Sequence, residues 1–487
     1  MRLRVVPFAF AGRRLRVAML EAEDVGVADE VSILTGRPVT PVGVTKEILG
    51  ELLRQAYGTT AAQMAARLAG DEGPEDSLVS NLEAIDADDL HRMAEQPSLI
   101  NLVNLLILEA IRARASDIHI EPFEKKLTVK YRVDGVLREQ EAPPKHLQPA
   151  ITSRVKIMGG MNIAERYTPQ DGHITLRFDG RKIDIRVSTV PTLYGESVVM
   201  RILDKEAVNL DLESLGMRGP DSDAMNQLIG IPHGMVLVTG PTGSGKTTTL
   251  YAALTRVYDA TKKIITIEDP VEYELSGVNQ IPVNPKRGLS FASGLRSILR
   301  QDPDIIRVGE IRDGETAEIA VRAALTGHLL FSTLHTNNAV SAVGRLLDMG
   351  IEAFLLSSVL EGIIAQRLGR RICQHCRTPV PIAEGIRHRL SPAELAMFPG
   401  GTAFRGAGCE KCDGSGYHRR IGFFEVLLTT APMRAAISNR QSAPEIARTA
   451  AVGQVTMRQD GVLKASAGQT TLEEVLRATQ DTDEGGA

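Results

Sequence analysis

The sequence lacks any run of about 18 uncharged apolar residues, which is the length that a helix needs to cross a membrane. Its longest apolar candidate, residues 99–111, is too short. The chain also lacks a strong excess of one charge, since its formal net charge is −4 over 487 residues, with 43% hydrophobic and 24% charged residues. We therefore expect no membrane span, no nucleic-acid partner and no extensive disorder.

Cysteine is scarce, and the four cysteines present all belong to CxxC pairs. The pairs are Cys373 with Cys376 and Cys409 with Cys412. Four thiolates in two such pairs suit a tetrahedral Zn²⁺ with no open position for catalysis. His375 and His418 lie beside the pairs as alternative ligands, but four cysteines already complete the coordination. The pattern favours a zinc site in a reducing cytoplasm over a disulfide scaffold.

The N-terminal residues 1–20 carry arginines ahead of a short apolar stretch, as a signal peptide does. They also suit two strands joined by a turn glycine, and we favour this β-hairpin. Two short helices should follow and complete a small α+β module over residues 1–70. Residues 71–97 are acidic, with one arginine and no lysine, and are predicted to form a linker.

The hydrophobic pattern divides the rest of the chain. Residues 98–205 begin with an amphipathic helix and continue with strands of period two, which predicts an α+β domain. Residues 206–365 alternate apolar strands with helices, which indicates a parallel sheet covered on both faces. We expect a zinc-binding module over 366–425 and a helical segment over 426–487, so that the fold class is α/β.

The stretch GPTGSGKT, residues 240–247, matches the phosphate-binding P-loop between a predicted strand and a predicted helix. Its glycines allow backbone amides to point toward phosphate oxygens at the helix N-terminus. Lys246 would reach the β and γ phosphates of ATP, and Thr247 would hold Mg²⁺. The residues expected to bind nucleotide are Gly240, Pro241, Thr242, Gly243, Ser244, Gly245, Lys246, Thr247 and Thr248.

Acidic residues follow two of the later apolar strands. Glu268 and Glu272 lie at and just beyond the end of one strand, and Glu310 follows the next. A carboxylate at a strand tip beside a P-loop can hold the water shell of the metal or orient the attacking water. We expect Glu268 at the nucleotide and Glu310 at Mg²⁺, with either Glu272 or Glu310 activating water. His335, at the end of a further strand, is a better sensor of the γ phosphate than His328.

The sequence resembles the traffic ATPases of type II secretion and type IV pilus assembly in the order of four motifs. These are the P-loop, an acidic box at 264–273, a Walker B region at 301–313 and a histidine box at 326–338. Residues 114–122 and 169–176 resemble the N2 domain of that family, and the small N-terminal module resembles its type II secretion branch. The resemblance implies a RecA-like P-loop ATPase domain, a preceding α+β N2 domain and a tetracysteine zinc module.

The family resemblance also implies a homo-hexamer in which N2 of one subunit closes over the nucleotide of an ATPase domain. It places Arg186 and Arg201 of N2 at that cleft, with Arg296 and Arg300 of the ATPase domain. Without the resemblance, Arg186 and Arg201 would be solvent-facing strand residues. Arg307 departs from the family, which usually has an apolar residue there, and an arginine in a covered strand needs an acidic partner.

The resemblance further implies a cytoplasmic ATP hydrolase, peripheral on the inner membrane, that energises type II protein secretion through assembly of a pseudopilus. Its implied partners are the cytoplasmic domain of a bitopic inner-membrane protein, the L component, and a polytopic platform protein, the F component. An anionic membrane surface could also meet the arginines near the cysteines. These are Arg367, Arg370, Arg371, Arg377, Arg419 and Arg420. The alternatives are a pilus assembly motor and a nucleotide-gated adaptor with little turnover.

Overall fold

The computed structural model describes residues 5–11, 14–20, 22–45, 48–49, 97–179, 181–204, 211–450 and 455–479. The chain divides into two compact units, of which the first ends at Leu203 and the second holds the rest of the chain together with Asp179–Lys182, and each is described by itself. The predicted acidic linker, apart from residue 97, lies outside the described residues, as does most of the second helix expected near the N-terminus. None of the described helices combines the length and the apolar character that crossing a membrane requires.

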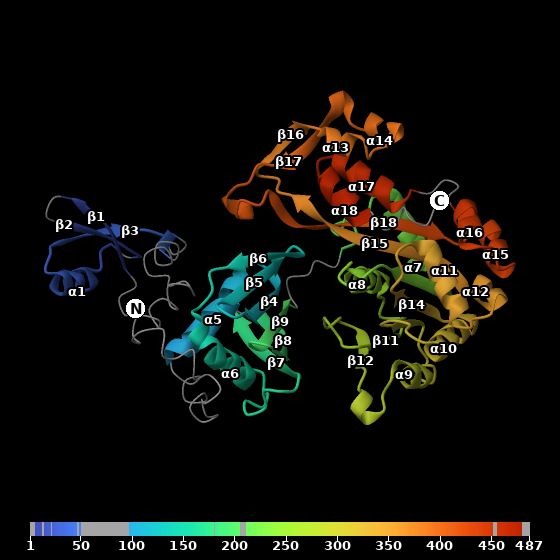
Figure 1. Ribbon diagram of the computed structural model, residues 1–487, viewed down its shortest axis with the longest axis horizontal. Coiled ribbons are helices and arrows are strands. Elements are labelled where there is room, and N and C mark those ends of the chain that lie inside the picture. The colour runs from blue at the N-terminus through green and yellow to red at the C-terminus, as the bar shows by residue number, and fades with distance from the viewer. Residues whose placement is uncertain are drawn as a thin grey trace. The chain divides into compact units, whose positions relative to one another are not determined.

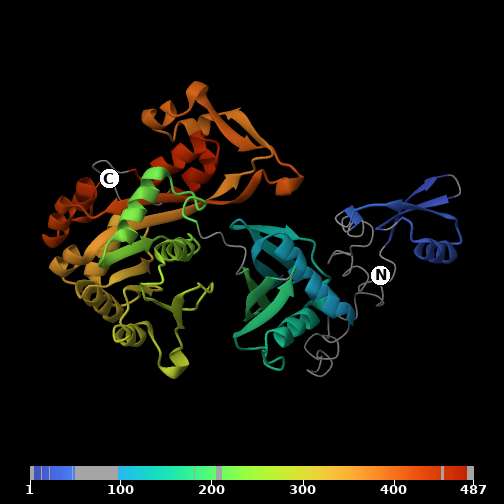
Figure 2. The same ribbon diagram turned by 180° about the vertical axis from the view of Figure 1, so that it is seen from behind.

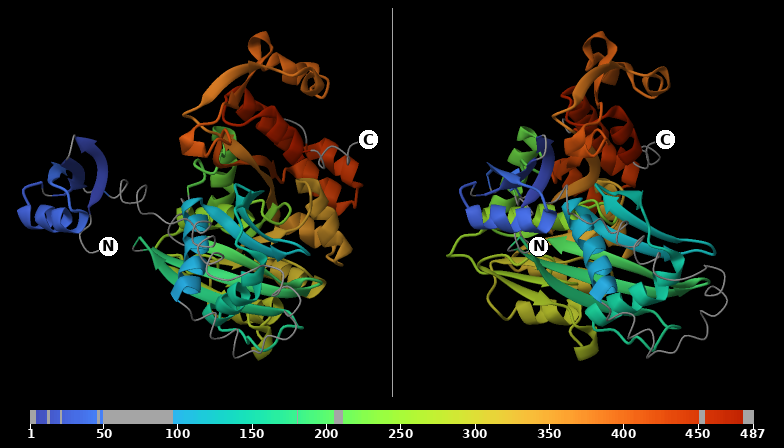
Figure 3. Two further views of the ribbon diagram at one scale, coloured as in Figure 1. Left: turned by 60° about the vertical axis from the view of Figure 1, so that its left-hand side comes forward. Right: turned by 90° about the vertical axis from the view of Figure 1, so that its left-hand side faces the viewer.

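The N-terminal strands form the predicted hairpin, in which β1 (Val6–Ala11) pairs antiparallel with β2 (Arg14–Met19). Strand β3 (Val39–Gly43) pairs parallel with β2. Helix α1 (Val25–Thr35) follows β2 and lies against β3 (Figure 3). Its first turn is capped by the side chain of Asp24, which accepts a hydrogen bond from a backbone amide. The hairpin and the first helix of the small α+β module are therefore confirmed.

The second part of the first unit is a sheet with strand order β6-β5-β4-β9-β8-β7. Its strands are β4 (Ala115–Pro122), β5 (Leu127–Val133), β6 (Val136–Gln140), β7 (Gln170–Phe178), β8 (Arg181–Thr192) and β9 (Gly195–Asp204). One face packs against α5 (Pro97–Arg112) and α6 (Gln148–Met158) (Figure 2), and α6 follows a 3₁₀ turn at Lys145–Leu147. Alternate strand residues lie in this core, so that the intervening residues belong to the opposite, more polar face.

The second unit contains a sheet with strand order β12-β11-β13-β14-β10-β15-β18. The strands are β10 (Gly234–Thr239), β11 (Ile264–Glu268), β12 (Val278–Pro282), β13 (Ile305–Val308), β14 (Leu329–Leu334), β15 (Leu360–Ile372) and β18 (Tyr417–Leu428). Neighbours from β12 to β15 pair parallel, and β18 pairs antiparallel with β15. Every residue of β10, β11, β13 and β14 is buried, as expected of parallel strands covered on both faces.

Helices cover both faces of this sheet (Figure 1). One face shares a hydrophobic core with α7 (Gly219–Gly230) and α8 (Lys246–Val257). The other core holds residues of α9 (Phe291–Ile298), α10 (Gly314–Leu325), α11 (Ala339–Asp348) and α12 (Ala353–Val359). It continues into the C-terminal helices α15 (Ala431–Ser438), α16 (Ala443–Ala450), α17 (Met457–Ser466) and α18 (Leu472–Thr479). The predicted α/β fold is confirmed.

The cysteine-containing segment is inserted between two strands of this sheet. It includes an antiparallel ribbon of β16 (Arg377–Pro381) and β17 (Thr402–Gly406), with the short helices α13 (Glu384–Arg387) and α14 (Pro392–Ala396) between them. The structure differs from the predicted domain limits here, because residue 366 lies inside β15 and residue 426 inside β18. The insertion is therefore carried by the seven-stranded sheet itself.

Candidate functional site

The P-loop connects the carboxyl end of β10 to the first turn of α8. Gly240, Gly243 and Gly245 have φ angles of 146°, 79° and 88°, which residues with a side chain rarely adopt. A Cβ on Gly240 would lie 2.4 Å from the carbonyl oxygen of Gln366, so glycine is also required by space. The backbone of the loop thus leads directly into the N-terminus of α8. Amide groups and the helix dipole there favour a bound anion.

Lys246, the first residue of α8, is 8% exposed. Its ammonium group donates to the carbonyl oxygens of Gly240 at 2.7 Å and Pro241 at 3.1 Å. Burial lowers the pKa of Lys246 to about 8, while the charge of Glu310 opposes this change and that of Arg367 adds to it. A buried cation of this kind gains electrostatic stabilisation when a phosphate group binds beside it.

The residues that follow Lys246 are held by a neighbouring strand. Thr247 and Thr248 are half-buried in the first turn of α8, and the hydroxyl of Thr249 donates to the side-chain oxygen of Gln366 at 2.7 Å. Gln366 belongs to β15, which pairs parallel with β10. Sequence reasoning missed Gln366 because it assigned this residue to a separate zinc module.

Glu310 lies just beyond the carboxyl end of β13, with its side chain 17% exposed. Its carboxylate accepts a hydrogen bond from Arg312 at 2.5 Å and lies 3.2 Å from Nε2 of His335. Burial acts to raise the pKa of Glu310, but the hydrogen bond and charge of Arg312 and the charge of His335 outweigh it and leave the pKa below its usual value. The structure therefore holds an ionised carboxylate at this edge of the sheet, and Arg312 is a partner that sequence reasoning missed.

The two histidines of the histidine box lie at opposite ends of β14. His328 precedes the strand and contacts the carbonyl oxygen of Ala323, whereas His335 follows it. Thr336 ties the loop after His335 to the P-loop strand, because its amide donates to the hydroxyl of Thr239 at 3.1 Å. His335 is thus the histidine placed near Glu310 and the carboxyl end of β10.

Glu268 has a different environment from Glu310. It is buried at the end of β11 and forms an ion pair with Arg307 of β13, with 2.5 Å between Oε2 and a guanidinium nitrogen. It also accepts hydrogen bonds from Tyr251, Thr266 and Gln280. Arg307 therefore has the acidic partner that its position requires, which confirms that prediction. A carboxylate engaged by these four side chains has little capacity left for the water shell of a metal.

Glu272 lies in the loop after β11, and the same buried network holds this loop. The amide of Glu272 donates to the hydroxyl of Tyr251 at 3.3 Å. Gln280 donates to the carbonyl oxygen of Tyr273 at 2.9 Å and accepts from the amide of Leu275 at 2.7 Å. Because parallel strands end at a common edge, Glu272 belongs to the same edge of the sheet as the P-loop and Glu310.

Arg186 and Arg201 belong to strands β8 and β9 of the first unit. They alternate with buried residues, which places both on the sheet face opposite the core formed with α5 and α6. The guanidinium of Arg201 donates to Asp117 at 2.9 Å. The side chain of Arg201 is 60% exposed, which leaves it accessible on this face.

Arg296 and Arg300 lie in the second unit, on α9 and just after it. Arg296 contacts Glu315 at 2.5 Å, and Arg300 donates to the carbonyl oxygen of Arg296 at 2.9 Å. Both arginines are exposed. The contacts that the structure describes for Arg296 and Arg300 therefore lie on the surface of α9 and α10.

The four cysteines come together in one cluster, with all sulfur atoms within 4.8 Å of one another. The Sγ–Sγ distances are 3.8 Å for Cys373 and Cys409, 3.8 Å for Cys376 and Cys412, and 3.7 Å for Cys409 and Cys412. A tetrahedral site with Zn–S bonds of about 2.3 Å requires sulfur separations of about 3.8 Å. The donor set and its spacing therefore fit Zn²⁺, as the sequence predicts.

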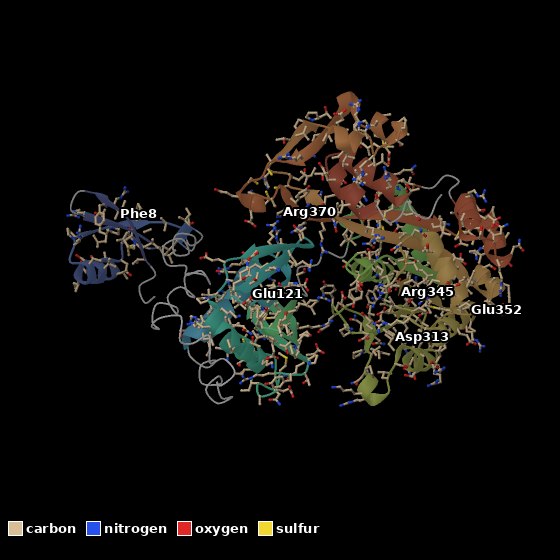
Figure 4. All side chains as sticks on the ribbon, in the orientation of Figure 1. Phe8, Glu121, Asp313, Arg345, Glu352 and Arg370 are labelled. Carbon is tan, nitrogen blue, oxygen red and sulfur yellow. The ribbon has the colours of Figure 1, made fainter. Side chains whose placement is uncertain are left out.

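Three of the six arginines expected to form a basic patch near the cysteines contact described side chains. Arg370 (labelled in Figure 4) lies over the ring of Tyr417, 4.0 Å from its centroid. It also donates to Glu474 at 2.9 Å. Arg377 stacks over the ring of Phe404. Arg367 donates to Asn337, which follows the histidine box residue His335. The remaining members of the predicted patch are Arg371, Arg419 and Arg420.

Two family models match the chain. The model of the type II/IV secretion system protein family matches residues 92–477, and the MshEN domain model matches residues 1–63. Type II secretion system protein E of Dickeya dadantii is 47% identical, with 98% of this chain and 97% of that protein covered. The type IV pilus assembly ATPase PilB of Myxococcus xanthus is 44% identical, with coverages of 98% and 84%.

Solved structures share the fold of the chain. The pilus retraction motor PilT with bound ADP is 29% identical, with a TM-score of 0.53, over 78% of this chain and 97% of that chain. The ATPase DotB of Legionella pneumophila is 21% identical, with a TM-score of 0.59 and coverages of 79% and 96%. These ATPases and the parallel sheet support the RecA-like fold.

Proposed function

The chain belongs to the type II/IV secretion system protein family, and from this membership we propose that it is the ATP-hydrolysing motor of a type II secretion system. Its work would be the assembly of a pseudopilus that energises protein export. The observation that carries the proposal is the arrangement at one edge of the sheet: Lys246 in the P-loop, and the ionised Glu310 held by Arg312 and His335.

We assign ATP binding to residues 240–248. The loop amides and Lys246 would hold the β and γ phosphates, and Lys246 would exchange its bonds to loop carbonyls for bonds to phosphate oxygens. Thr247 and Glu310 would provide oxygen ligands for Mg²⁺, directly or through its water shell. When bound, Mg²⁺ neutralises the charge that builds up on the phosphates.

We assign the orientation of the attacking water to Glu310. Its carboxylate is ionised, partly buried and held from two sides, so it can accept a hydrogen bond from water without first losing a proton. Water attacks the γ phosphorus, and the bond to the bridging oxygen of ADP breaks. Glu272 is the alternative, since it belongs to the same edge. His335 would link the position of Glu310 to the presence of the γ phosphate.

We propose that the site is completed in a homo-hexamer. Arg186 and Arg201, on the polar face of N2, would reach the nucleotide of another subunit and stabilise the charge of the transition state. An arginine supplied in this way typically increases the rate about 10³- to 10⁵-fold. Arg296 and Arg300, exposed on the ATPase domain, would contribute to the same cleft.

We propose that the four cysteines bind one Zn²⁺ with a structural role. The cluster lies in the insertion between β15 and β18, and the sulfur spacing supports this assignment. Since all four ligands come from the protein, the metal has no open position for substrate. Zinc would therefore fix the insertion on the ATPase sheet.

The partners that we propose are those of the secretion branch. The N-terminal module would dock on the cytoplasmic domain of the L component, and the motor would act on the polytopic F component. With these partners, the protein would lie in the cytoplasm, peripheral on the inner membrane. Arg371, Arg419 and Arg420 would face anionic lipid there. The identity to protein E of Dickeya dadantii over nearly the full length of both chains supports this branch.

Release of phosphate from ATP over many turnovers tests the proposal against a nucleotide-gated adaptor. We expect sustained release by the full-length protein and none by Lys246→Ala, whereas an adaptor would bind ATP and release almost no phosphate. Pilus assembly is the second candidate because PilB of Myxococcus xanthus is 44% identical. Deletion of the gene distinguishes these two functions: loss of exported proteins with intact pili supports secretion, and the reverse supports pilus assembly.

A further inference from the structure

Strand β15 brings a second cationic residue to the P-loop. It pairs parallel with the P-loop strand β10, with Ala365 opposite Thr239. The next residue, Gln366, has its carbonyl oxygen against Gly240, because a Cβ on that glycine would lie 2.4 Å away. Arg367 follows directly, so its backbone begins beside the first glycine of the loop.

The side chains of Gln366 and Arg367 leave β15 on opposite faces. Gln366 turns to α8 and bonds Thr249, whereas Arg367 turns to the loop after β14 and donates to the side-chain oxygen of Asn337 at 3.2 Å. Asn337 follows His335 and Thr336, and Thr336 is tied to Thr239 at the end of β10. Arg367 is therefore held between the P-loop strand and the histidine box.

The positive charges of Arg367 and Lys246 at the P-loop favour the binding of a polyanion. Arg367 and Lys246 both lie at the first glycine of the P-loop, because Arg367 follows Gln366 beside Gly240 and Lys246 donates to the carbonyl oxygen of Gly240 at 2.7 Å. The nearby carboxylate of Glu310 is itself held by Arg312 and His335. Two neighbouring cations repel each other until an anion binds between them.

We propose that Arg367 is a further nucleotide-contacting residue, and that it binds the terminal phosphate of ATP within its own subunit. A guanidinium group can donate two parallel hydrogen bonds to phosphate oxygens, and Asn337 would hold it ready before ATP arrives. ADP lacks the terminal phosphate, so this contact favours ATP over ADP. The inference rests on the proposed ATP-binding function and adds to it a residue that distinguishes triphosphate from diphosphate.

Binding of two nucleotides to the full-length protein tests this role. The dissociation constants of a non-hydrolysable ATP analogue and of ADP, each with Mg²⁺, are measured by calorimetry. A charge-assisted hydrogen bond contributes roughly 1.5 to 3 kcal/mol, so Arg367→Ala should weaken binding of the ATP analogue about 10- to 100-fold. Binding of ADP should change less than about twofold, because the diphosphate makes no contact with Arg367.

Two further variants make the result specific. Arg345→Ala removes an exposed arginine from α11 (Figure 4) and should change neither constant. Arg367→Lys keeps the charge but cannot donate two parallel hydrogen bonds, so it should lose part of the preference for ATP over ADP. If Arg367→Ala fails to fold, Arg367→Lys takes its place in the test. An equal loss for both nucleotides, or an unchanged preference in a folded Arg367 variant, would overturn the inference. Failure of the wild type to bind either nucleotide would instead refute the proposed function.

Discussion

Arg307 and Glu268 form a buried ion pair between two neighbouring strands. The side chain of Arg307 is 3% exposed and that of Glu268 is 2% exposed, and the guanidinium lies over the ring of Tyr251, 4.9 Å from its centroid. The sequence reveals that Arg307 needs an acid, because an unpaired charge in a covered strand is costly. It does not reveal which acid, since β11 and β13 become neighbours only in the folded sheet. Sequence reasoning therefore assigned Glu268 to the nucleotide.

The Arg307 and Glu268 pair leads to a stability prediction. Arg307→Met leaves Glu268 buried without its cation, and breaking a buried pair in this way typically costs about 3 to 5 kcal/mol. The double variant Arg307→Met with Glu268→Gln should recover much of this loss, because it leaves no buried charge. Hydrogen exchange of β11 and β13 in the full-length protein measures the effect. A double variant as unprotected as the single one would contradict the pairing.

Lys246 leads to a prediction about pH. Burial lowers its pKa to about 8, and a bound phosphate favours the charged form. Below pH 8 the ammonium is already charged, so affinity for the ATP analogue should vary little. Above pH 8 binding must be accompanied by proton uptake, and affinity should fall by up to about tenfold per pH unit. Calorimetry from pH 7 to pH 9.5 measures this; affinity that stays constant over the whole range would show that Lys246 keeps an ordinary pKa.

At the scale of elements, strand β15 explains why the sequence predicted a domain limit at residue 366, inside a continuous strand. Its first half lies between β10 and β18, whereas beyond Ala365 the register continues with β18 alone. The sequence therefore changes from LEGIIA, with one charged residue, to QRLGRRI, with three, inside one strand of 13 residues. A covered strand and a partly exposed strand have different patterns, so the sequence suggested a domain limit at 366 where the chain has none. The buried strands β10, β11, β13 and β14 were predictable because they are covered along their whole length.

The cysteine insertion leads to a prediction about zinc. The purified protein should contain about one Zn²⁺ per chain, because the four sulfurs have the spacing of a tetrahedral site. In Cys409→Ser the ribbon of β16 and β17 should lose protection from hydrogen exchange, while β10 and β14 keep theirs because every residue of these two strands is buried. Metal analysis and exchange of the same sample measure both effects. Freshly reduced wild-type protein without zinc would refute the site.

At the scale of the whole molecule, the candidate catalytic groups belong to two different units. Lys246 and Glu310 lie in the second unit, and Arg186 and Arg201 lie in the first. The order of motifs along the chain predicts this division, since each motif is a local pattern. The role proposed for the arginines depends on assembly between subunits, which a local pattern does not encode. It therefore came from the family resemblance.

Assembly leads to a prediction about rate. If arginines of N2 complete the site of another subunit, the ATPase rate per subunit should rise as the protein assembles. Arg186→Ala should bind ATP almost normally but hydrolyse it about 10³- to 10⁵-fold more slowly, the range typical of such arginines. The rate is measured against protein concentration, with the assembly state followed by light scattering. A rate per subunit that is equal for monomer and hexamer would exclude the requirement for assembly.

The central claim is that this protein hydrolyses ATP with Glu310 as the group that orients water. The most direct test is a single-turnover measurement on Glu310→Gln, with bound ATP and released phosphate determined in the same reaction. Glutamine keeps the size of the side chain but removes the charge that Arg312 and His335 stabilise. We predict wild-type occupancy by ATP and hydrolysis slowed about 10²- to 10⁴-fold, the usual contribution of a general base. Hydrolysis at the wild-type rate would contradict the claim and leave Glu272 as the candidate.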